Sequence, residues 1–197
     1  MNIGEFIASI NLFDLLFMLG LFGFFILGFL QGTIRRLLDL LAVAFSFLLA
    51  MQIRGPLGDF LAQNWTQFPP EYAVMFGFLL AFVTTLIILL VLIQAFYRPV
   101  AIFVRFPILD EVLGGVLGMV FFALLIGAMI VIFDSFFALP GFVEDEDEIG
   151  ILRAIYDFYN PSATAALYRD TVIPWLFALL PFFVPSDLQE LYPQLDF

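Results

Sequence analysis

The stretch "GFLQGTIRRLLDLL", residues 28–41, joins two strongly apolar runs. The first run, residues 15–34, holds no charge, and the second, residues 37–53, carries only Asp39. A single helix through both would be roughly 63 Å long, about twice the hydrocarbon thickness of a bilayer, so the chain must turn between them. Glycine adopts turn angles easily, and the polar neighbours favour water. The stretch therefore predicts a membrane hairpin with its break at Gly32.

Composition supports a lipid surrounding for the whole chain. Hydrophobic residues make up 63% of the 197 residues and charged residues only 13%, which lies outside the range of soluble domains. Two further charge-free runs follow the hairpin, at residues 73–97 and 112–133, and each is long enough to span. We predict an all-α polytopic membrane protein with four transmembrane helices. The second span is the shortest and suggests a thin or tilted fit.

The composition changes after the fourth run. We divide the chain into a four-span membrane domain, residues 1–136, and an acidic linker with a tail, residues 137–197. "ILRAIYDFY", residues 151–159, has the spacing of a short amphipathic helix at the interface. "IPWLFALLPFFVP", residues 173–185, is apolar but short and interrupted by prolines, so it should lie along the membrane rather than cross it.

The arginines predict the orientation. Two follow the first span and two follow the third, whereas the predicted loop after the second span holds only Arg54; the four are Arg35, Arg36, Arg98 and Arg105. Positive residues favour the cytoplasmic side of a membrane. We therefore expect both connections with paired arginines in the cytoplasm, and both termini, with the acidic run at 144–148, outside.

Several function classes are disfavoured by what the sequence contains. Eighteen acidic residues face seven basic ones, all arginine, and the net charge of −11 argues against nucleic-acid binding. The chain has no cysteine and no histidine, so a thiolate metal site, an imidazole ligand, a cysteine nucleophile and a histidine general base are all excluded. We expect no catalysis, no cofactor and no metal.

Charged residues near the span ends are the candidates for chemistry. Three acids lie there: Asp14, Asp110 and Asp134. An acid within lipid can carry protons or ions. We favour structural roles: Asp14 would cap its own helix, Asp134 would reach water, and Asp39 would pair with Arg35 and Arg36 at helical spacing. On this interpretation Asp14→Asn and Asp134→Asn leave function largely intact.

Two pairs of glycines have the spacing that lets helices approach closely. Gly28 and Gly32 are four positions apart, as are Gly114 and Gly118. Small residues at this spacing line one face of a transmembrane helix and favour close packing. We expect the first and fourth spans to meet through these faces, and the alternative is that each face binds a partner. The centres of the four spans hold no ionisable group, which disfavours a carrier.

Together these residues resemble the colicin V production protein (CvpA) family, four-span membrane proteins of bacteria. The resemblance covers roughly residues 12–136. Its pattern is Asp14 before an apolar span, Gly32 and Arg35 in the turn, "LDEVLGGVLG" with Asp110, Gly114 and Gly118 opening the fourth span, and Asp134 at its end. Family members usually have arginine where this chain has Gln31, and often Arg–Gly where it has Phe121 and Phe122.

The resemblance implies a protein of the bacterial inner membrane that assists export, toxin production or envelope homeostasis without catalysis. Helix packing with other integral membrane proteins, or self-association, is the mechanism we expect, with membrane lipids around it. Two alternatives stay open: an accessory subunit of a larger respiratory or photosynthetic complex, and a small channel or proton-coupled carrier.

Overall fold

The computed structural model describes residues 11–65, 72–98, 107–138 and 149–192. These residues form helices and no strand, and four of the helices are long and apolar enough to cross a membrane. The prediction of an all-α, four-span protein is confirmed. The expectations about Arg105 and the acidic run at 144–148 concern residues outside the described ones.

The long helices are α2 (Leu12–Gln31), α3 (Thr33–Asn64), α4 (Ala73–Phe96) and α5 (Pro107–Phe137). The tail follows as α6 (Gly150–Tyr159), α7 (Ala163–Leu167), a π-helical turn η2 (Tyr168–Val172), α8 (Ile173–Leu179) and α9 (Ser186–Gln189).

The break between the first two spans falls at Gly32, as predicted. Gly32 ends α2 and precedes α3 with a φ of 78°, a backbone conformation that favours glycine. The hydroxyl of Thr33 donates to the backbone oxygen of Asp110 at 2.8 Å, which ties the turn to the start of α5. A Cβ on Gly32 would also lie 2.7 Å from Oδ2 of Asp110. The turn therefore requires glycine for its backbone and for the space beside α5.

The second span is longer than the sequence predicted. We expected a loop to begin at residue 54, but α3 continues through Pro56 to Asn64. Packing explains the extension, because a Cβ on Gly58 would lie 2.8 Å from Cα of Val74, and one on Gly77 would lie 2.9 Å from the backbone oxygen of Arg54. Contact with α4 therefore stabilises α3 beyond its apolar run, in a segment where hydropathy alone does not predict a spanning helix.

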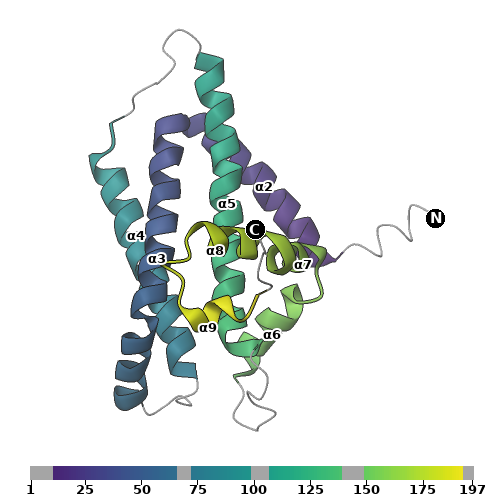
Figure 1. Cartoon of the computed structure of the whole chain (residues 1–197). Coiled ribbons are helices and arrows are strands. Elements are labelled where there is room, and N and C mark those ends of the chain that lie inside the picture. The colour runs from purple at the N-terminus through teal and green to yellow at the C-terminus, as the bar shows by residue number, and fades with distance from the viewer. Residues whose placement is uncertain (1–10, 66–71, 99–106, 139–148, 193–197) are drawn as a thin grey trace, which may run out of the picture.

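The four long helices form two close pairs. Helix α2 packs chiefly on α5, helix α3 packs on α4, and the two pairs meet where α3 contacts α5. Helices α2 and α3 diverge from the Gly32 turn, and the tail lies across α3 and α5 on one side of the bundle (Figure 1). The tail is thus packed on the long helices, and its position along the membrane surface stays a prediction.

Candidate functional site: charged residues that hold the tail

Asp134, near the end of α5, is the centre of a buried hydrogen-bond cluster. Its side chain is 1% exposed. Arg169 donates from Nε to Oδ2 and from Nη2 to Oδ1, both at 2.7 Å. The hydroxyl of Tyr192 donates to Oδ2 at 3.1 Å, and that of Tyr159 donates to Oδ1 at 3.3 Å. Each carboxylate oxygen accepts two bonds, so one acid of α5 binds three separate parts of the tail.

The groups around Asp134 are held in fixed protonation states. The hydrogen bonds from Arg169 to the carboxylate raise the pKa of that guanidinium. Burial, reinforced by the negative charge of Asp134, raises the pKa of the Tyr159 and Tyr192 hydroxyls. At neutral pH the arginine is therefore charged and both tyrosines are neutral. This arrangement is a charge-assisted clamp with a bidentate arginine.

The arginine of this clamp is itself positioned by the tail. Nη1 of Arg169 donates to Oδ1 of Asn160 at 2.7 Å. Its guanidinium carbon lies 5.7 Å from the ring centroids of both Tyr156 and Tyr159. Aromatic faces attract cations at this distance. These contacts within the tail hold the guanidinium of Arg169 toward Asp134.

Asp14 holds a second part of the tail. Its Oδ1 accepts from the backbone N–H of Thr164 at 2.8 Å, and its Oδ2 from that of Ala163 at 3.1 Å. These N–H groups begin α7, so the acid of α2 stabilises the N-terminus of a helix in the tail. The prediction that Asp14 caps its own helix is wrong: Asn11 caps α2 by accepting from the backbone N–H of Phe13 at 2.8 Å.

Helix α3 supplies a third attachment. Arg54, which is 7% exposed, forms an ion pair with Asp187 of α9. Two residues earlier in α3, Nε2 of Gln52 donates to the backbone oxygen of Phe183 at 2.6 Å. Three of the four long helices therefore contribute a polar side chain to the tail: Asp14 from α2, Arg54 from α3 and Asp134 from α5.

The predicted cluster at the start of α3 is brought together. Nε of Arg35 lies 3.3 Å from Oδ1 of Asp39, and Nη1 of Arg36 lies 3.3 Å from Oδ2. The guanidinium carbon of Arg36 also lies near two stacked rings, 5.9 Å from the centroid of Phe24 and 5.7 Å from that of Phe121. Arg36 thereby bridges α2, α3 and α5, which gives the cluster a role in packing.

The glycines of α2 and α5 also meet. A Cβ on Gly28 would overlap the backbone oxygen of Gly114, and one on Gly118 would overlap that of Phe24. A Cβ on Gly114 would lie 2.5 Å from the backbone oxygen of Gly28. The backbones of the two helices are in contact along this seam, so the glycines are occupied within the chain and do not present a face to a partner.

The structure corrects the interpretation of Asp134 and adds residues that the sequence did not reveal. Asp134 does not reach water, because Arg169, Tyr159 and Tyr192 enclose it. The sequence contains one indication of this contact. Of the two arginines in the tail, Arg153 has an acid four positions away, Asp157, and pairs with it at 3.1 Å, whereas Arg169 has no acid three or four positions away. Among the described residues, no group of three or more acidic, cysteine or histidine side chains is placed to hold a metal.

Four spanning helices, a glycine seam and a clamped helical tail define a small polytopic membrane protein. The family model of the colicin V production protein matches residues 13–155, so the chain belongs to the colicin V production protein family. The match includes Asp14 and Asp134 and ends before Arg169 and Tyr192. Comparison with curated proteins and with solved structures finds no match.

Proposed function

We propose that this colicin V production family protein assists export, toxin production or envelope homeostasis in the bacterial inner membrane as a non-catalytic packing partner of other integral membrane proteins. Helix α2 carries the proposal. In its spanning window 11% of the residues are buried, against 28–44% in the other three helices. Its glycine seam faces α5, and among the described residues nothing covers the opposite side, which leaves it open to a helix of another protein.

The free side of α2 has the shape that close helix contact needs. A Cβ on Gly23 would meet nothing within 4 Å, and the large side chains of Leu19, Phe22 and Ile26 around it are exposed. A small residue between larger apolar ones lets a second backbone approach, and packing of this kind drives association within lipid. The charged residues support packing over transport, because Asp14, Asp39 and Asp134 are all bonded within the chain.

This proposal predicts where a partner can be cross-linked. A photoreactive amino acid at Phe22 of α2 is expected to give protein adducts in intact cells, because this face contacts the partner. The same group at Ile88 of α4, which is similarly exposed, serves as the control and should give lipid adducts alone. Equal protein adducts from both positions, or from neither, would contradict a partner surface on α2.

We also propose that both termini lie outside the cytoplasm. The junction of α2 and α3, which Arg35 and Arg36 follow in the sequence, lies near one end of the bundle, and α6 and α9 of the tail lie toward the other (Figure 1). The connections between spans at the Gly32 end carry arginine, whereas residues 65–72 between α3 and α4 carry none, and this difference favours the Gly32 end for the cytoplasmic side.

The chain has no cysteine, so single substitutions report the orientation directly. In intact cells, Asn64→Cys is expected to react with a membrane-impermeant maleimide, whereas Gln31→Cys should react after the membrane is opened. Both residues are exposed, so burial does not explain a difference between them. Labelling of Gln31→Cys but not of Asn64→Cys in intact cells would show that the protein has the opposite topology.

A further inference from the structure

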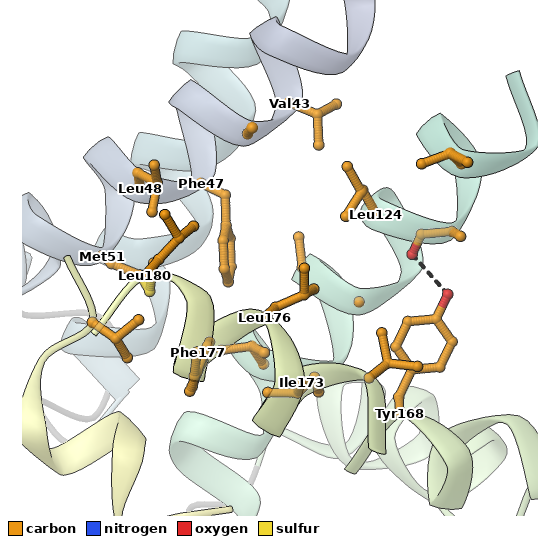
Figure 2. Close-up of a pocket in the computed structure, with 18 residues that line it drawn as sticks. Val43, Phe47, Leu48, Met51, Leu124, Tyr168, Ile173, Leu176, Phe177 and Leu180 are labelled. Atoms are coloured by element: carbon orange, nitrogen blue, oxygen red, sulfur yellow. Dashed lines mark hydrogen bonds between the residues drawn. The ribbon is translucent and has the colours of Figure 1, made fainter. Parts of the chain in front are cut away.

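An apolar cavity of about 320 Å³ lies between α3, α5 and the tail (Figure 2). Helix α3 contributes Val43, Phe47 and Met51, helix α5 contributes Leu124, and the tail closes the cavity with Leu176 and Leu180. Among the lining side chains, the polar group is the hydroxyl of Tyr168, and it already donates to the backbone oxygen of Ala123 at 2.8 Å. The cavity offers no free side-chain hydrogen-bonding group to a polar ligand.

The depth of the cavity places it in the hydrocarbon layer. Its residues on α3 fall within 43–51, and at a rise of about 1.5 Å per residue they lie roughly 15–27 Å from Thr33 at the Gly32 turn. A hydrocarbon layer is about 30 Å thick. The cavity therefore falls within the length of α3 that a hydrocarbon layer can cover.

The outer surface of the tail is apolar at the same place. Trp175, Leu179, Phe182 and Phe183 are exposed, and the side chain of Phe182 is 96% exposed. An interfacial helix with one face in water carries polar residues on that face, and α8 carries none. The segment that closes the cavity is thus apolar on both sides, which fits immersion in hydrocarbon and gives the cavity access to lipid chains rather than to water.

We propose that an acyl chain of a membrane phospholipid occupies this cavity. A dry cavity of about 150 Å³ already binds benzene, and ligand sites begin near 300 Å³, so the volume is sufficient for a segment of an acyl chain. The chain would pack against α3, α5 and α8 together and stabilise the docked tail. This site is independent of the partner surface on α2.

The test uses the full-length protein in vesicles of phosphatidylethanolamine and phosphatidylglycerol that include a phosphatidylethanolamine with a photoreactive acyl chain. Adducts are expected on cavity residues such as Phe47, Leu124 and Leu176. Leu124→Trp, which fills the cavity from α5, should reduce these adducts by about tenfold or more, since a tenfold change in affinity corresponds to the burial of about two methylene groups. Ile88→Trp on the exposed face of α4 is the control and should leave them unchanged.

A second filling variant, Leu176→Trp, repeats the experiment from the tail side, and hydrogen exchange of α6 to α9 verifies that each variant keeps its tail docked. Adducts confined to the outer surfaces of α2 and α4 would overturn the proposal. So would unchanged cavity adducts in both filling variants, or a peptide of another protein cross-linked at Phe47 in cells where lipid adducts are absent.

Discussion

Asp134→Ala is expected to release the tail from the long helices at a cost of about 3–5 kcal/mol, the usual effect of removing one partner from a buried ion pair. The side chain of Asp134 is 1% exposed and that of Arg169 is 22% exposed, so the arginine would lose its counter-charge where water replaces it poorly. Tyr159 and Tyr192 would lose their acceptor as well. Hydrogen exchange of the backbone amides in α6 to α9 measures the release.

Asp157→Ala is the matched control for this change. Asp157 also pairs with an arginine of the tail, Arg153, but the two side chains are 54% and 45% exposed. Exposed pairs of this spacing contribute only about 0.3–0.5 kcal/mol. Exchange in the tail should therefore stay near that of the unmodified protein, and equal effects of the two substitutions would show that Asp134 is not the clamp. The geometry also revises the expectation for Asp134→Asn, which should weaken docking because the ion pair is lost.

Gly28→Ala is expected to disrupt the contact between α2 and α5. In an open helix this change stabilises by about 1 kcal/mol, because alanine has the higher helix propensity. Here the new Cβ would overlap the backbone oxygen of Gly114, which cannot move aside as a flexible side chain can. Overpacking costs about 1–3 kcal/mol or more, so a net loss of stability should result. Gly118→Leu, which meets the backbone of Phe24, should have the larger effect.

The control lies on the same helix. Gly23→Ala adds the same methyl group where nothing lies within 4 Å, so stability should be unchanged or slightly higher. Thermal unfolding in mild detergent, with gel filtration to detect aggregation, distinguishes the variants. A Gly28→Ala protein as stable as Gly23→Ala would contradict the close seam between α2 and α5.

The features predicted correctly from the sequence depend on short-range patterns. Charge-free runs long enough for a bilayer identified the spans, and one glycine among polar residues identified the turn at Gly32. The cluster of Arg35, Arg36 and Asp39 follows from spacing within one helix. In each case the interacting residues are close in the chain, so periodicity and composition contain the information.

The docked tail depends on contacts between distant residues. Asp134 and Arg169 are 35 positions apart, and Asp14 and Thr164 are 150 apart. No helical period relates such pairs. From the sequence alone, an acid at the end of a span could equally face water, cap a helix or bind a distant residue. The extension of α3 to Asn64 was missed for a similar reason, because contact with α4 through Gly58 maintains it beyond the apolar run.

A cross-link that replaces the clamp tests most directly whether the span-end acids hold the tail or carry ions. The protein would carry Asp134→Leu and Arg169→Met, which remove the charged pair, together with Gln52→Cys and Phe183→Cys joined by a short bismaleimide. Gln52 and Phe183 are already joined by a hydrogen bond of 2.6 Å, and the chain has no other cysteine. Export and envelope phenotypes are then measured in cells that lack the natural protein. We predict loss of function without the cross-link and recovery with it; continued loss of function with the tail fully cross-linked and protected from exchange would show that the Asp134 carboxylate acts in its own right.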